Sequence, residues 1–151
     1  MGRVLAGHED RHNRGGRATV TRRHPLNRLS SPLFDGAALA PGTHVNGVGS
    51  FTLETREVDE TTVRRARVFI DSLESALDEA GDLVLAESAG ATRRDDWTEL
   101  GRVAAGTAPG RAGPEEITFF KSVGHAVQDV AVATRAVRAA REQGLGRELS
   151  L

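Results

Sequence analysis

The chain has 151 residues and a formal net charge of −1, with no cysteine. Its length suits one domain or part of a larger one, and its near-neutral charge gives no sign of a nucleic-acid partner. The lack of cysteine excludes disulfides and cysteine-ligated metals, and no metal site is predicted. There is neither an apolar run of about eighteen residues nor a signal-peptide core, so the sequence predicts a cytoplasmic protein without a membrane partner.

Residues 1–30 form a basic segment with seven Arg and only two acids, Glu9 and Asp10. The segment shows no apolar repeat of strand or helix period. One interpretation is a basic arm that binds nucleic acid. We favour a disordered leader, because the segment contains no aromatic residue that could stack on bases.

From about residue 31 the sequence becomes regular, with turn signals at Asp35-Gly36 and Pro41-Gly42. Apolar spacing, caps and β-branched runs define the elements that follow. In chain order these are a strand over 43–48, a short helix over 58–66, a strand over 67–71, a helix capped by Ser72 and ended by Gly81, a short helix in 98–106, and a strand over 116–122.

The last predicted element is a long helix over 123–143, ended by Gly144. Its apolar residues recur every three or four positions and form one stripe. The stripe consists of Val123, Ala126, Val127, Val130, Thr134, Val137 and Ala140.

Strands that alternate with helices predict an α/β fold, with a mainly parallel sheet and helical crossovers. Ligands of open α/β sheets bind at the carboxyl ends of the strands. The segment THVNGVGSF, residues 43–51, is such an end. Gly47 and Gly49 would let a flat ring approach the backbone, and Asn46 offers an amide to a polar group of such a ligand. The equally plain alternative is a tight turn capped by Asn46.

A second candidate site is KSVG, residues 121–124, at the junction of a strand with the long helix. Free N–H groups and the helix dipole favour an anion there. Ser122 also fits an ordinary helix N-cap. Lys121 could be a charge beside a cofactor, but Lys at a strand end is more often solvated.

Five motifs in sequence resemble the ornithine cyclodeaminase/mu-crystallin family from about Ser31 to the C-terminus. They are FDG with PGTHVNGVGSF, REVD, RARVFIDS with EAGDL, ELGRVAAG, and EITFFKSVG with AVQD. The resemblance implies a partial Rossmann-type domain, a homodimeric NAD(P)-dependent enzyme, and an amino or cyclic imino acid substrate. It implies cofactor contacts at Val45, Asn46, Gly47, Val48, Gly49 and Ser122, and substrate contacts at Val123 and Gly124.

Two departures from the family bear on activity. Cyclodeaminases place a proton-handling Asp where this chain has Phe51, so no catalytic residue is assigned and imine reduction is favoured over ornithine cyclisation. The chain also lacks a G-x-G-x-x-G pyrophosphate loop. We therefore expect weak binding of NAD or NADP and no activity from this chain alone. The alternative is a non-catalytic dimerisation or binding module that pairs with a second copy or an intact paralogue.

The resemblance stops abruptly near Ser31, where family members have a segment similar to VVTAT. In a GC-rich gene, the codons of residues 24–30 read one base later can restore a similar segment. We therefore interpret residues 1–30 as a disordered or frame-shifted leader. Residues 31–151 are interpreted as the C-terminal half of a Rossmann-type NAD(P)-binding domain.

Overall fold

The computed structural model describes residues 19–21, 31–147 and 149. Its strands are β1 (Thr19–Thr21), β2 (His44–Gly47), β3 (Arg67–Ile70), β4 (Thr98–Glu99) and β5 (Thr118–Lys121). Its helices are α1 (Glu60–Arg65), α2 (Leu73–Glu79), α3 (Gly81–Ser88), α4 (Leu100–Ala104) and α5 (Ala126–Glu142), with short 3-10 turns at Gly36–Ala38 and Arg94–Asp96.

The strands form one sheet in the order β1-β2-β5-β3-β4, and every neighbouring pair is parallel. β5 lies between β2 and β3, so that Val45, Phe119 and Val68 stand side by side. The three predicted strands and the parallel sheet with helical crossovers are confirmed. Because the strands are parallel, the carboxyl ends of β2, β5 and β3 meet at one edge of the sheet.

One face of the sheet carries the hydrophobic core. Phe119 is fully buried, and the core combines strand residues with apolar residues of α1, α2 and α3. The helices begin where the sequence supplies caps. The Asp59 carboxylate accepts a hydrogen bond of 2.7 Å from Thr62 N, and the Ser72 hydroxyl accepts one from Ser75 N.

Gly81 does not end the helical region as predicted; it begins α3, a helix that the sequence analysis did not identify. A Cβ at Gly81 would lie 2.2 Å from the Thr55 carbonyl oxygen and 2.5 Å from that of Thr52. The glycine is therefore required by close backbone approach rather than by helix termination. The helix predicted in 98–106 is also shorter, because Thr98–Glu99 pairs with β3 as β4.

β1 lies within the basic segment 1–30, where the sequence predicts no regular structure. It pairs with β2 in register, Val20 opposite Val45. The remaining expectations for this segment fall outside the described residues.

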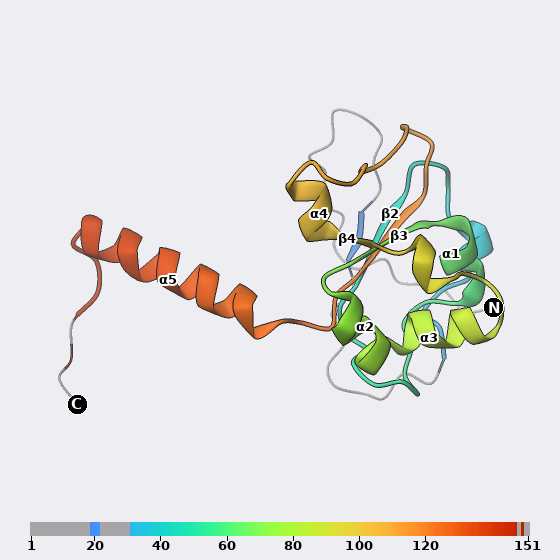
Figure 1. Cartoon of the computed structure of the whole chain (residues 1–151), viewed down its shortest axis with the longest axis horizontal. Helices are drawn as coiled ribbons and strands as arrows, with labels where there is room; N and C mark the ends of the chain where they lie inside the picture. Colours follow the sequence, from blue (N-terminus) through green and yellow to red (C-terminus); the bar gives the residue numbers. More distant parts are fainter. Residues whose placement is uncertain (1–18, 22–30, 148, 150–151) are drawn as a thin grey trace, which may run out of the picture.

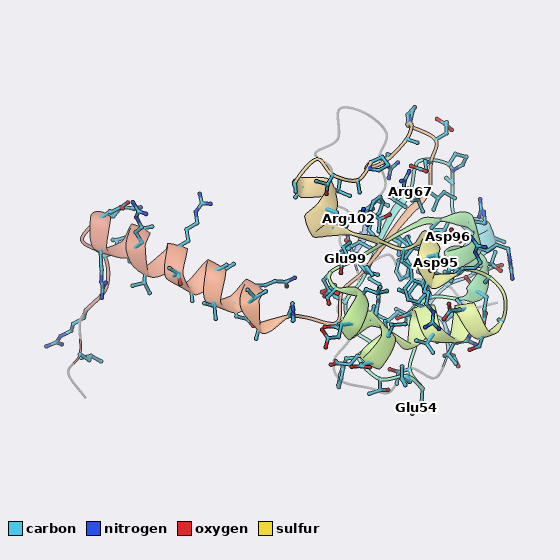
Figure 2. All side chains as sticks on the ribbon, in the orientation of Figure 1. Glu54, Arg67, Asp95, Asp96, Glu99 and Arg102 are labelled. Carbon is cyan, nitrogen blue, oxygen red and sulfur yellow. The ribbon has the colours of Figure 1, made fainter. Side chains whose placement is uncertain are left out.

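The long helix is confirmed, but it begins at Ala126 rather than at residue 123. Gly144, with a φ of 65°, follows its last turn as predicted. α5 contains no buried residue, and Figure 1 shows it projecting away from the sheet. Figure 2 shows its side chains standing clear of the other elements. None of the helices in the described part of the chain is long and apolar enough to cross a membrane.

Candidate functional site at the carboxyl edge of the sheet

Three short segments leave the sheet at its carboxyl edge: 48–50 after β2, 122–124 after β5, and 71–72 after β3. β5 pairs with both other strands, with Lys121 opposite Gly47 on one side and Ile70 on the other. The two segments that the sequence assigns to ligand binding, 45–49 and 122–124, are therefore brought together. Ser122 N also donates a hydrogen bond of 3.0 Å to the Gly47 carbonyl oxygen.

The glycines at the end of β2 and just after it are explained by packing within the chain. A Cβ at Gly47 would lie 2.9 Å from the Phe119 ring, and one at Gly49 would lie 2.5 Å from Glu57 Oε1. Val45 is part of the core, so its side chain does not reach the edge. Val48, in contrast, is 48 % exposed. The edge therefore offers the backbone of this segment, rather than the Val45 side chain, to a ligand.

Asn46 points to the opposite face of β2 from the core, together with His44. Asn46 Oδ1 lies 3.2 Å from His44 Nε2, and His44 Nδ1 lies 2.7 Å from Thr118 Oγ1. Arg111 Nη2 donates to the same Thr118 oxygen at 2.7 Å. Burial lowers the pKa of His44, the Asn46 hydrogen bond opposes that shift, and the charge of Arg111 adds to it. The net lowering favours a neutral imidazole.

The turn after β5 is occupied by an internal carboxylate. Asp71 Oδ2 accepts hydrogen bonds from Ser122 Oγ at 2.8 Å and from the N–H groups of Val123 and Gly124, each at 3.1 Å. Ser122 is therefore not a helix cap, and this correction follows from the later start of α5, whose N-cap is His125. The N–H groups of Val123 and Gly124, which the sequence predicts to be free for an anion, already donate to Asp71.

Lys121 is not solvated, contrary to the usual position of a lysine at a strand end. Its side chain is 0 % exposed. Nζ lies 2.6 Å from the Ser50 carbonyl oxygen, 2.7 Å from Ser50 Oγ and 2.9 Å from Asp82 Oδ2. Sequence reasoning missed Ser50 and Asp82 altogether, because no spacing rule links them to Lys121.

Glu57, in the REVD segment, is buried beside the same lysine. Glu57 Oε2 accepts from Gly49 N at 2.6 Å and Ser50 N at 3.3 Å, and lies 3.9 Å from Lys121 Nζ. All buried side-chain nitrogen and oxygen atoms in the described part of the chain have a hydrogen-bond partner. The described residues also contain no group of three or more His, Asp or Glu that could hold a metal.

The edge itself is open. The cavity beside Asn46 and Gly47 has a volume of about 20 Å³, enough for little more than one water molecule. Phe51, which stands where cyclodeaminases place an Asp, is 55 % exposed. The cavity beside Asn46 and Gly47 is therefore too small to enclose a dinucleotide.

Known proteins of similar sequence and structure point to one family. Residues 17–144 match the ornithine cyclodeaminase/mu-crystallin family, so the match begins before the predicted boundary at Ser31. Delta(1)-pyrroline-2-carboxylate reductase of Colwellia psychrerythraea is 40% identical over 104 residues, which are 68% of this chain and 33% of that protein. The chain thus spans about a third of the length of this curated relative.

Two solved structures share the fold. Delta(1)-pyrroline-2-carboxylate reductase of Thermococcus litoralis, in complex with NADH and L-proline, superposes with a TM-score of 0.73 at 36% identity, covering 81% of this chain and 38% of that one. Iminosuccinate reductase of Paracoccus denitrificans, in complex with NAD+, gives 0.71 at 34% identity, covering 83% and 38%. The chain belongs to the ornithine cyclodeaminase/mu-crystallin family.

Proposed function

We propose that the chain supplies the carboxyl-edge wall of a nicotinamide dinucleotide site in an enzyme that reduces cyclic imino acids by hydride transfer. The observation that carries this proposal is the convergence of 45–49 and 122–124 at one edge of a parallel sheet. Ligands of open α/β sheets bind at that edge. The names of the two pyrroline-2-carboxylate reductases described above supply the substrate class, because pyrroline-2-carboxylate is a cyclic imino acid.

The uncovered backbone at the edge fits a flat, partly polar ligand. Val48 and Gly124 are exposed, and a Cβ built on Gly124 would meet no atom within 4 Å. Asn46 and the backbone of 47–49 would hold the cofactor with Ser122, and Val123 and Gly124 would face the substrate. When bound, NADH or NADPH supplies the hydride. The residues of this chain would orient the cofactor and the substrate relative to each other, and would hold the backbone segments that contact them in a fixed conformation.

Phe51 supports imine reduction over ornithine cyclisation. Its phenyl ring cannot accept a proton, whereas the carboxylate of an Asp at that position could. Reduction of a C=N bond that is already formed does not require this carboxylate. We therefore assign the substrate class as imino acids that carry a preformed C=N bond.

Titration of the 15N-labelled chain with NADH and with NADPH tests the proposal. We expect weak binding that moves the amide signals of Gly47, Gly49, Ser122 and Gly124. Val48→Asp should weaken binding further, because a carboxylate at the edge repels the anionic dinucleotide. Leu53→Asp is the matched control, since Leu53 is also exposed, at 39 %. Signal changes confined to other parts of the chain would overturn the assignment.

A second candidate function is a non-catalytic module that pairs with another copy or with an intact relative. The exposure of α5 favours it, because Val130 and Val137 are 64 % and 50 % exposed. Co-expression with a full-length family member from the same genome separates the two functions. A stable complex that forms through α5 and leaves the edge unliganded would favour the module.

A further inference from the structure

The ammonium of Lys121 is saturated by groups of the protein. It has three donors, and three acceptors lie within 2.9 Å: both oxygens of Ser50 and one of Asp82. The side chain is fully buried at the end of β5, so it has no contact with solvent. Lys121 is therefore not available to bind a ligand directly.

Asp82, in the first turn of α3, is equally occupied. Its Oδ2 accepts from Lys121 and from the Ser50 hydroxyl, while Oδ1 accepts from Glu57 N at 2.6 Å and Val58 N at 2.9 Å. The carboxylate thus joins four pieces of chain: the end of β5, the loop after β2, the segment before α1, and α3. Its place in the first turn of a helix favours the negative charge.

Such a buried pair is a poor means of stabilising a fold. The free energy needed to remove two charges from water is about as large as the free energy gained from their attraction. Replacing a buried ion pair by apolar residues of similar size therefore often leaves the stability of a protein unchanged or raises it. The role of the Lys121–Asp82 pair is therefore sought in the parts of the chain that its hydrogen bonds hold in place. Lys121 contacts the carbonyl and hydroxyl of Ser50, and Glu57 beside it accepts from Gly49 N and Ser50 N. Donors and acceptors of this short loop are thus held from both sides.

We propose that Lys121 is a positioning residue: paired with Asp82, it fixes the backbone of Gly49 and Ser50 at the carboxyl edge in the conformation that receives the dinucleotide. This inference rests on the proposed function for its ligand. The positioning itself does not, because the state of the loop can be measured without a ligand.

Three variants test the inference. Lys121→Met removes the charge at similar length. Lys121→Met/Asp82→Asn removes both charges, and the new amide keeps an oxygen for the N–H groups of Glu57 and Val58 and an N–H for Ser50 Oγ. Val63→Ala is the matched control, because Val63 is a core residue of α1, 2 % exposed, and its apolar side chain cannot form a hydrogen bond or ion pair with Lys121 or Asp82. Each is compared with the full chain by denaturant unfolding, amide hydrogen exchange and NADH titration.

We expect the double variant to fold with a stability no lower than that of Val63→Ala. Its Gly49 and Ser50 amides, which donate to Glu57, should nevertheless exchange about tenfold faster than in the parent chain, and its NADH dissociation constant should rise about tenfold, because the loop loses both hydrogen bonds from Lys121 to Ser50. Val63→Ala should keep the exchange rates and the NADH affinity of the parent chain. A loss of stability alone cannot produce this difference.

Two results would overturn the inference. If the Gly49 and Ser50 amides of the double variant exchange as slowly as in the parent chain, and its NADH affinity is unchanged, Lys121 contributes packing volume and has no positioning role. If the double variant fails to fold, the pair is required for the fold itself and the positioning role is rejected. If the parent chain gives no NADH signal while the exchange rates change as expected, the proposed function fails but the positioning role stands.

Discussion

Ser122 and Asp71 lie at the carboxyl ends of neighbouring parallel strands, and the Ser122 hydroxyl donates a hydrogen bond of 2.8 Å to Asp71 Oδ2. The same oxygen accepts from Val123 N and Gly124 N, and Asp71 Oδ1 accepts from Ser72 N at 3.0 Å. One carboxylate therefore holds the turn after β5 to the turn after β3. Together with the lysine pair, it fixes both candidate ligand segments from within the chain.

Replacing Asp71 by Ala should lower the free energy of unfolding by about 1–3 kcal/mol, because Ser122 and two N–H groups lose their acceptor. The freed N–H groups then form an anion site, so added sulfate should restore part of the loss in the variant and have a smaller effect on the parent chain. Denaturant unfolding with and without sulfate measures both effects. Asp95→Ala, at an exposed acid of the 3-10 turn labelled in Figure 2, is the control. Equal stability of the Asp71 and Asp95 variants would contradict the prediction.

The Asp59 carboxylate predicts a loss of stability in acid. Burial alone would raise its pKa, but hydrogen bonds from Gly36 N, Thr62 Oγ1 and Thr62 N outweigh burial and lower the pKa from its ordinary value of 3.8. Because the folded-state pKa lies below the unfolded value, the contribution is complete above 3.8 and is lost as pH falls through the folded-state pKa.

We therefore expect Asp59→Ala to cost about 1 kcal/mol at neutral pH, as expected for a lost helix cap, and less in strong acid. Denaturant unfolding at about pH 7 and about pH 3 gives the difference. Asp35→Ala is a matched control, because Asp35 caps only the 3-10 turn at Gly36–Ala38, through a bond to Ala37 N. A cost for Asp59→Ala that is the same at both pH values would show that the charge of Asp59 contributes nothing.

The central strands could be predicted from sequence because their signals are local. Residues 67–70 (RVFI) and 118–121 (TFFK) contain runs of β-branched and aromatic residues, and their pairing follows from helical crossovers. β1 was missed because three residues in a basic context carry no period, and its pairing with β2 is a tertiary contact. α3 was missed because Gly81 has the usual signature of a helix end, whereas the Thr52 and Thr55 carbonyl oxygens are what require it.

The two candidate segments were predicted to lie at the carboxyl edge of the sheet, where the structure has them, but their internal support was not predicted. Parallel strands bring 45–49 and 122–124 together whatever the side chains are, so that placement follows from topology. Burial of Lys121 depends on Ser50 and Asp82, which are distant in sequence. A single sequence cannot distinguish this lysine from a solvated one, because the difference lies in partners that only the fold supplies.

His44 should titrate below its ordinary pKa of 6.5 and should become easier to protonate when Arg111 is replaced. Burial, followed by the positive charge of Arg111, lowers its pKa against the effect of Asn46. Arg111→Met removes one of the two lowering causes, so the pKa of His44 should move up. The measurement is an NMR titration of the imidazole, with Arg102→Met, on α4 in Figure 2, as control. An unchanged His44 pKa in Arg111→Met would contradict the contact geometry.

The lowered pKa of His44 also predicts how the stability of the chain depends on pH, because protonation and folding are thermodynamically linked. Because the folded-state pKa is lowered, His44 contributes stability that is complete above 6.5 and is lost as pH falls through the folded-state pKa. The parent chain should therefore become less stable as pH falls below about 6.5, and His44→Gln should reduce that slope. Unfolding experiments at several pH values between about 5 and about 8 measure the slope. A steeper dependence of the unfolding free energy on pH in His44→Gln would show that folding does not lower the pKa of His44.

The exposed stripe of α5 should drive self-association. Val127, Val130 and Val137 lie on one side of the helix and are 62 %, 64 % and 50 % exposed, so water contacts an apolar surface along most of its length. Val130→Glu/Val137→Glu should shift sedimentation toward the monomer at a given concentration, because pairing would bury two carboxylates. Val132→Glu is the matched control: Val132 is 69 % exposed but lies on the opposite side of the helix. A parent chain that sediments as a compact monomer at all concentrations, with sharp cooperative unfolding, would contradict this prediction and would mean that α5 is stable in water without a partner.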